Sequence, residues 1–217
     1  MKGLIFDMDG TMVDNMMVHH RAWQETFADV GINMSLEEVM EKAHGINTEI
    51  LERLFNDQFT VEKRVQISNR KEENYRRIFF DRLQLLPGLQ NLIEEAFALG
   101  VPMTIASAAP IENVDYVLDN LSLRHYFQNI FHAGSVTKGK PDPEVYLMAA
   151  ESMGLACADC IVFEDSVTGA EASSRAGAKS VIVTTTHQPS EFQAFENILH
   201  FIKDFAEISL DDLINRS

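Results

Sequence analysis

The chain alternates short apolar runs with longer segments in which apolar residues recur every three or four positions. Four of the runs have the length and unbroken hydrophobicity of strands that are buried on both faces, as in a parallel sheet. A further short apolar segment occupies residues 129–131. Strands that alternate with helices predict an α/β fold with a doubly wound parallel sheet, covered by helices on both faces. The four predicted strands occupy residues 3–6, 101–106, 160–163 and 180–183.

Residues 16–82 have a different pattern, in which helical spacing continues without a strand-like run. Trp23 and Phe27 share one face of the first predicted helix, and Ser35 with Glu38 forms the capping-box pattern that opens the second. The stretch ends in a long helix rich in Lys, Arg and Glu. It predicts an inserted all-helical domain, which leaves residues 1–15 and 83–217 for the sheet-forming core.

Length and charge limit the classes of partner. The 217 residues suffice for one α/β domain with an insertion, and their formal net charge is -15 at pH 7. Such an acidic chain is unsuited to a nucleic-acid backbone or an anionic membrane, and we expect neither as a partner. No apolar stretch has transmembrane length, and the N-terminus enters a strand without a signal peptide. We therefore expect a cytoplasmic protein that is a monomer or a weak homo-oligomer.

Cys157 and Cys160 form the Cys-x-x-Cys pattern of redox and zinc sites. A zinc site would need a second pair of ligands, and no cysteine or histidine pair of suitable spacing is evident elsewhere. A thioredoxin-like site would follow a strand and open a helix, whereas this pair precedes the apolar run at 161–163. We interpret both cysteines as reduced thiols at a helix-to-strand junction.

Polar residues that can carry chemistry occur repeatedly where a predicted strand ends. Two aspartates follow the first strand, a serine follows the second, and a glutamate and an aspartate follow a later one; a lysine lies in the loop at 137–141. Because ligands of open α/β sheets bind at the carboxyl ends of the strands, these groups predict a site. The residues are Asp7, Asp9, Ser107, Lys140, Glu164 and Asp165.

Side chains of these types, brought to one point, suit phosphoryl transfer. Converging carboxylates repel each other unless a cation lies among them, and oxygen ligands with open water positions suit Mg²⁺. A lysine and a hydroxyl beside the cation form a pocket for a tetrahedral anion. One aspartate can then attack phosphorus, while the other protonates the leaving oxygen and later deprotonates water.

These segments resemble the four ordered motifs of the haloacid dehalogenase superfamily. The resemblance covers nearly the whole chain and implies a Rossmann-like core. It also implies that residues 16–82 are the helical cap of the β-phosphoglucomutase and phosphoglycolate-phosphatase-like branch. The matching segments are Asp7-Met8-Asp9-Gly10-Thr11, Ser107, Gly139-Lys140-Pro141-Asp142-Pro143 and Phe163-Glu164-Asp165-Ser166.

The same resemblance implies a role for each motif residue. It makes Asp7 the nucleophile and a metal ligand, and Asp9 the general acid/base and a ligand through its carbonyl. Glu164 and Asp165 are implied to complete a Mg²⁺ site. The groups implied to hold the phosphoryl oxygens are Ser107, the backbone of Ala108 and Lys140.

The helical stretch bears on the choice between a phosphatase and a phosphosugar mutase. His19, Trp23 and Lys71 fall where β-phosphoglucomutases place cap or hinge residues, which makes them candidates for substrate contact. Where the mutase carries an arginine that grips a second phosphate, this chain has Thr48. Threonine cannot replace the bidentate, charge-assisted contact of arginine. We therefore expect hydrolysis of a small phosphate monoester, such as a sugar phosphate, with a β-phosphoglucomutase-type mutase as the alternative.

Other classes fit the sequence less well. A receiver-type signalling domain also has an acceptor aspartate, a hydroxyl and a lysine at strand ends, but it is shorter and has no helical insert. A non-enzymatic scaffold would be expected to have lost one of the polar groups, and none is missing. A dehalogenase would usually lack Asp9. A phosphonate hydrolase would need a cap lysine that forms a Schiff base, a position for which the chain offers Lys42 or Lys71.

Overall fold

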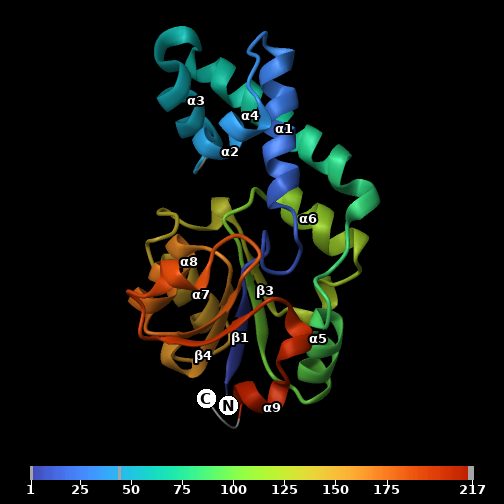
Figure 1. The fold of residues 1–217 in the computed structure, drawn as a ribbon. Coiled ribbons are helices and arrows are strands. Elements are labelled where there is room, and N and C mark those ends of the chain that lie inside the picture. Colours follow the sequence, from blue (N-terminus) through green and yellow to red (C-terminus); the bar gives the residue numbers. More distant parts are fainter. Residues whose placement is uncertain (1, 44, 215–217) are drawn as a thin grey trace. The chain divides into compact units, whose positions relative to one another are not determined.

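The computed structural model describes residues 2–43 and 45–214, and the chain forms two compact units (Figure 1). The first unit joins the segment that ends at Asp14 to the segment that begins at Gln84, and the second comprises Asn15–Leu83. The sequence placed these boundaries after residues 15 and 82. That the second unit acts as a cap stays a prediction.

The first unit is built on a six-stranded sheet in the order β3-β2-β1-β4-β5-β6, and every neighbouring pair is parallel. The order reverses direction beside β1, so the chain winds from the middle of the sheet to both edges. This arrangement confirms the predicted doubly wound α/β fold. The strands are β1 (Gly3–Phe6), β2 (Met103–Ala106), β3 (Asn129–Phe131), β4 (Cys160–Glu164), β5 (Lys179–Val183) and β6 (Ile198–Ile202).

Two details of this unit differ from the sequence-based interpretation. The edge strand β6 was not predicted, because His200 interrupts its apolar run and its central residues are exposed rather than buried. The pair Asp142-Pro143 has the pattern of an N-cap and a first helical residue, but the helix begins one residue later, at Glu144. Asp142 still accepts a hydrogen bond from the backbone N–H of Glu144, at 3.1 Å.

Helices cover both faces of the sheet. One group contains α7 and α8, which pack on each other, and α7 also packs on β1, β2 and β3. In the other group α5 packs on α9, and Figure 1 shows this group on the opposite side of the sheet. The helices of the unit are α5 (Leu89–Ala98), α6 (Ile111–Asn120), α7 (Glu144–Ser152), α8 (Val167–Ala176) and α9 (Leu210–Ile214).

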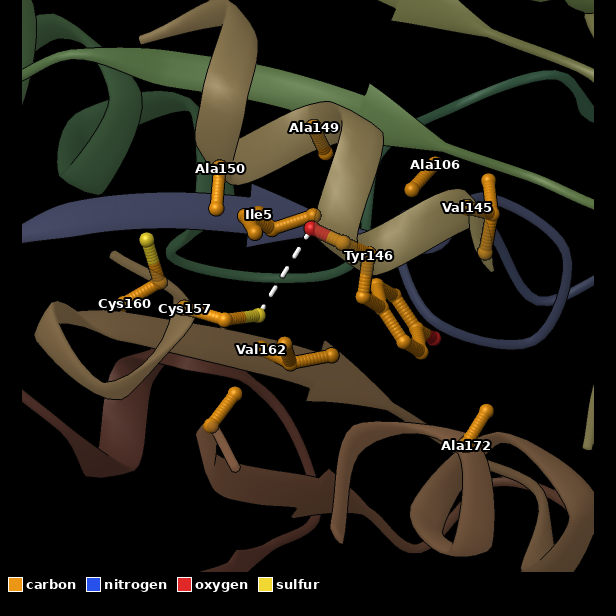
Figure 2. Packing of buried hydrophobic residues seen from close by; sticks show 11 residues of the cluster. Ile5, Ala106, Val145, Tyr146, Ala149, Ala150, Cys157, Cys160, Val162 and Ala172 are labelled. Atoms are coloured by element: carbon orange, nitrogen blue, oxygen red, sulfur yellow. Dashed lines mark hydrogen bonds between the residues drawn. The ribbon is translucent and has the colours of Figure 1, made fainter. Parts of the chain in front are cut away.

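The central strands are buried on both faces, which explains their unbroken apolar runs. Ile5 of β1 and Val162 of β4 are paired across the sheet and belong to the cluster beneath α7 (Figure 2). The next residues along the strands face the other way, where Phe6 stacks on Phe163 with ring centroids 4.7 Å apart. Because side chains alternate along a strand, β1 and β4 each contribute residues to the hydrophobic cores on both faces of the sheet.

The second unit contains only helices among its described residues. Ser35, the N-cap residue of α2, accepts a hydrogen bond from the backbone N–H of Glu38 through its hydroxyl. The Glu38 carboxylate accepts one from the backbone N–H of Ser35, so the predicted capping box forms. Trp23 and Phe27 stack in its core. No helix among residues 2–43 and 45–214 is long and apolar enough to cross a membrane. The helices are α1 (Met16–Asp29), α2 (Leu36–Lys42), α3 (Asn47–Phe55) and α4 (Val61–Phe79).

Both cysteines are buried free thiols, and Cys160 is the first residue of β4 while Cys157 lies in the turn just before it. The Cys157 thiol donates a weak hydrogen bond to the backbone carbonyl of Tyr146 across 3.6 Å (Figure 2). Burial raises the pKa of the Cys157 thiol to about 11 and that of the Cys160 thiol to about 12. Both groups therefore stay protonated at neutral pH.

The first testable prediction concerns these thiols. The thiolate is the reactive form, so native protein is expected to react slowly with a disulfide reagent at neutral pH, and the rate should rise as the pH approaches 11. After unfolding in denaturant, both thiols should react rapidly. Time courses of labelling with and without denaturant test this, and fast labelling of either native thiol at neutral pH would contradict it.

Candidate active site

The centre of the candidate site is the ammonium group of Lys140. Its Nζ donates to Asp7 Oδ1 at 2.7 Å, to Glu164 Oε1 at 2.6 Å and to the backbone carbonyl of Ala106 at 3.1 Å. These partners come from the ends of β1, β4 and β2, three adjacent strands of the sheet. The structure thus brings three of the predicted motifs together at the carboxyl edge, as parallel strands require.

The loop after β1 is shaped for close approach to the neighbouring strand. The Asp7 backbone N–H still bonds to the carbonyl of Phe163, at 3.0 Å, so the carboxylate leaves the sheet at a defined point. Gly10 has a φ of 75°, and a Cβ there would lie 2.2 Å from the Asp165 carboxylate. Only glycine both adopts this conformation easily and permits this contact.

Glu164 is held by donors on both carboxylate oxygens. Its Oε1 accepts from Lys140 and from the Tyr146 hydroxyl, each at 2.6 Å. Its Oε2 accepts from the Asp165 backbone N–H at 3.1 Å and from the Ser166 backbone N–H and hydroxyl at 3.1 and 2.9 Å. The carboxylate also lies against Gly169 of α8, where a Cβ would come within 1.9 Å of it. The Glu164 carboxylate is therefore held by the end of β4, the start of α8 and Lys140 together.

The Asp165 carboxylate is held by a side chain that follows β5, the strand next to β4. The Thr186 hydroxyl donates to Asp165 Oδ2 at 2.5 Å. The neighbouring Thr185 hydroxyl donates to the backbone carbonyl of Gly10, in the loop after β1. Burial, followed by the charge of Glu164, raises the pKa of Asp165 to about 7, and the charge of Asp9 adds a smaller contribution. Sequence reasoning missed Thr186, although a run of three threonines directly after the predicted strand at 180–183 was an available signal.

The acidic groups carry more negative charge than Lys140 balances. Burial raises the pKa of Asp7 well above its usual range, only partly opposed by Lys140. Burial also acts to raise the pKa of Glu164, but the Lys140 charge and the donors around it outweigh burial and lower it. Burial likewise acts to lower the pKa of Lys140, but Asp7 and Glu164 raise it well above its usual range. The arrangement therefore favours an ammonium on Lys140 and an ionised Glu164, whereas it disfavours the ionised form of Asp7.

The carboxylates fit a bound divalent cation. Asp7, Glu164 and Asp165 each offer an oxygen, and these oxygens lie within 4.8 Å of one another. Hard carboxylate oxygens with room for water are the ligand set that Mg²⁺ takes. A cation there would also oppose the repulsion from Glu164, which adds to the effect of burial in raising the pKa of Asp165.

The remaining predicted core residues lie in the same loops. Asp9 is half-buried in the turn after β1, where its backbone forms a bridge with Val13. Ser107 directly follows β2, is buried, and accepts a hydrogen bond from the backbone N–H of Ala109 at 3.0 Å. Ala108 is exposed between them.

Three of the four candidates in the helical unit form one cluster. The Lys71 ammonium is 2.8 Å from His19 Nδ1 and 2.9 Å from Glu72 Oε1, and it lies 5.8 Å from the centre of the Trp23 ring. The Lys71 side chain is only 5% exposed, so it is held by these partners rather than by solvent. Thr48 is half-buried in the first turn of α3.

Tyr146 was not identified from the sequence. It follows Lys140 by six residues, lies in α7, and donates its hydroxyl to Glu164. Burial and the adjacent Glu164 charge raise the pKa of its phenol well above the usual range, so the phenol stays a donor. The position of Tyr146 in the sequence does not indicate which group its hydroxyl contacts.

The fold and the site together define a narrow class of enzymes. The fold is a parallel doubly wound sheet, and its carboxyl edge carries a candidate nucleophilic aspartate, a lysine and two further acidic residues. A sequence profile of haloacid dehalogenase-like hydrolases matches residues 1–177. The chain belongs to this hydrolase family, which confirms the resemblance identified from the motifs.

Relatives with assigned names are similar over most of the chain. YhcW of Bacillus subtilis is 32% identical over 218 residues, which cover 99% of this chain and 96% of YhcW. The fructose-1-phosphate phosphatase YqaB of Escherichia coli is 29% identical over 83% of this chain and 95% of its own length. The occurrence of named phosphatases among the relatives agrees with the predicted phosphoric monoester hydrolase.

Solved structures share the whole fold. A HAD hydrolase, family IA, variant 3, from Entamoeba histolytica has a TM-score of 0.89 and 26% identity, and the match covers 99% of this chain and 98% of that one. The β-phosphoglucomutase of Clostridium difficile has a TM-score of 0.83 at 23% identity, with 98% of this chain and 95% of that one covered. At that identity the second likeness shows the fold alone.

Proposed function

We propose that the protein is a Mg²⁺-dependent phosphatase that hydrolyses a small phosphate monoester, such as a sugar phosphate, through a phosphoryl-aspartate intermediate. The observation that carries this proposal is the Lys140 ammonium, which bridges Asp7 and Glu164 beside Asp165 at the edge of the sheet. The named phosphatase among the relatives supports the class of substrate.

Asp7 is the proposed nucleophile. One of its carboxylate oxygens attacks phosphorus, so that an Asp7–phosphorus bond forms while the bond between phosphorus and the ester oxygen breaks. Asp9 gives its proton to the leaving oxygen. Asp9 then takes a proton from a water molecule, whose oxygen attacks the phosphoryl group and regenerates the Asp7 carboxylate with release of phosphate.

The phosphoryl group is proposed to be held by Lys140, the Ser107 hydroxyl and the Ala108 backbone N–H. The Ser107 oxygen already accepts from Ala109, which orients the hydroxyl. Lys140 is pre-positioned by its three acceptors and adds a positive charge where negative charge develops.

The cation site is proposed to be made by the Asp7 and Asp165 carboxylates and the Asp9 carbonyl, with Glu164 beside them. Bound Mg²⁺ would neutralise the phosphoryl oxygens and the acidic cluster. Thr186 keeps the Asp165 carboxylate in one orientation.

Substrate selection is proposed to lie with the helical unit, residues 16–82, acting as a cap. Its candidate contacts are His19, Trp23, Thr48 and Lys71. Because Lys71 is already paired with Glu72, and Thr48 lacks a charge, we infer a substrate with one phosphate group rather than two. A cytoplasmic location and a monomeric or weakly associated state belong to the same proposal, and light scattering tests the latter.

The second testable prediction is the activity itself. Phosphate release from a panel of sugar phosphates is expected with Mg²⁺, and excess chelator should abolish it. Full activity in chelator would reject the metal assignment. The panel includes β-glucose 1-phosphate with a coupled readout for glucose 6-phosphate, and formation of glucose 6-phosphate with little free phosphate would identify a mutase instead.

A further inference from the structure

Tyr146 lies at the boundary between the hydrophobic core and the candidate site. Its side chain is fully buried in the cluster beneath α7, with Ile5 of β1 and Val162 of β4. Figure 2 shows the ring extending toward the carboxyl ends of these two strands, away from the two cysteines. The backbone carbonyl of Tyr146 is engaged by Cys157, so the residue is held at both ends.

The tyrosine touches two residues of the site and uses a different part of its side chain for each. The hydroxyl donates to Glu164 Oε1 at 2.6 Å. The Lys140 ammonium lies 4.9 Å from the centre of the ring, within the range of a cation–π contact. Lys140 and Glu164 also bond directly to each other, so the three side chains form a closed triangle.

The triangle restricts both charged groups. Glu164 Oε1 accepts two hydrogen bonds, and Oε2 accepts three, so the carboxylate has no free direction in which to rotate. The Lys140 ammonium is in turn fixed by Glu164, Asp7 and the ring face. Outer groups that orient charged side chains around a metal site typically change affinity or activity by about 10–100-fold when removed.

We propose that Tyr146 is a positioning residue of the active site, whose hydroxyl fixes Glu164 and, through it, Lys140. The proposal rests on the proposed Mg²⁺-dependent phosphatase function. It assigns to the tyrosine hydroxyl a role that packing alone does not require, because phenylalanine would fill the same space and keep the cation–π contact.

The test is Tyr146→Phe, with Tyr126→Phe as the matched control from the same unit. Mg²⁺ affinity is measured without substrate, from the rise in melting temperature with Mg²⁺ concentration, and kcat and KM are measured separately. We expect Tyr146→Phe to weaken Mg²⁺ binding about tenfold and to lower kcat by a similar factor. Tyr126→Phe should behave as the parent protein.

A double-mutant cycle with Glu164→Gln separates positioning from packing. If the hydroxyl acts through Glu164, the effect of Tyr146→Phe on Mg²⁺ binding should largely disappear in the Glu164→Gln background. A Tyr146→Phe protein with parent Mg²⁺ affinity and kcat, or equal effects in both backgrounds, would overturn the positioning role. A parent protein that neither binds Mg²⁺ nor releases phosphate would instead overturn the proposed function, and this inference with it.

Discussion

Replacement of Asp7 by asparagine is expected to lower turnover by roughly a thousandfold or more, while the protein remains folded. The amide oxygen cannot form the phosphoryl intermediate that the carboxylate forms. The variant can still accept the hydrogen bond from Lys140 that the structure shows at 2.7 Å. Phosphate release with Mg²⁺, measured alongside thermal unfolding, tests both parts of the expectation.

The stability of Asp7→Asn is as informative as its activity. Burial raises the pKa of Asp7 well above its usual range, and Glu164 and Asp165 add to the effect, so the ionised carboxylate is unfavourable there. A neutral amide relieves this repulsion, and the melting temperature should stay unchanged or rise. Asp14→Asn, at an exposed position of the same loop, is the control. An active Asp7→Asn protein, shown by mass spectrometry to be free of deamidation, would refute the covalent mechanism.

Replacement of Lys140 by alanine is expected to remove activity and also to destabilise the fold by about 3–5 kcal/mol. The lysine side chain is 7% exposed and bridges two carboxylates that are also buried, at 2.7 and 2.6 Å. Its loss leaves the ionised Glu164 and the neighbouring Asp7 buried together without a cation or its hydrogen bonds. Chemical denaturation measures the free energy of unfolding, and phosphate release measures the activity.

The control for this variant is Lys138→Ala, which removes an exposed lysine from the same loop. Mg²⁺ should raise the melting temperature of Lys140→Ala more than that of the parent, because the cation then supplies charge that the lysine no longer provides. If Lys140→Ala is as stable as Lys138→Ala, the buried ion pairs do not hold the site together. The prediction would then be wrong.

The sequence alone determined the strands of the core and the edge at which the site forms. Unbroken apolar runs appear because the central strands are buried on both faces, and the polar residues that follow them must meet at one edge. The weaker signal of β6 was missed because an edge strand is partly exposed and need not be continuously apolar. The helices of residues 16–82 were likewise predicted from the spacing of the apolar residues along this segment.

What only the tertiary structure decided is how the site is held in place. Tyr146 was not identified from the sequence, because the partner of its hydroxyl depends on how α7 packs over β1 and β4. The bond from Thr186 to Asp165, and the contact of Gly169 with Glu164, likewise join groups whose distance is set by strand order and helix placement. Periodicity specifies which face of an element is buried, whereas the contacts between particular side chains follow from packing among elements distant in the chain.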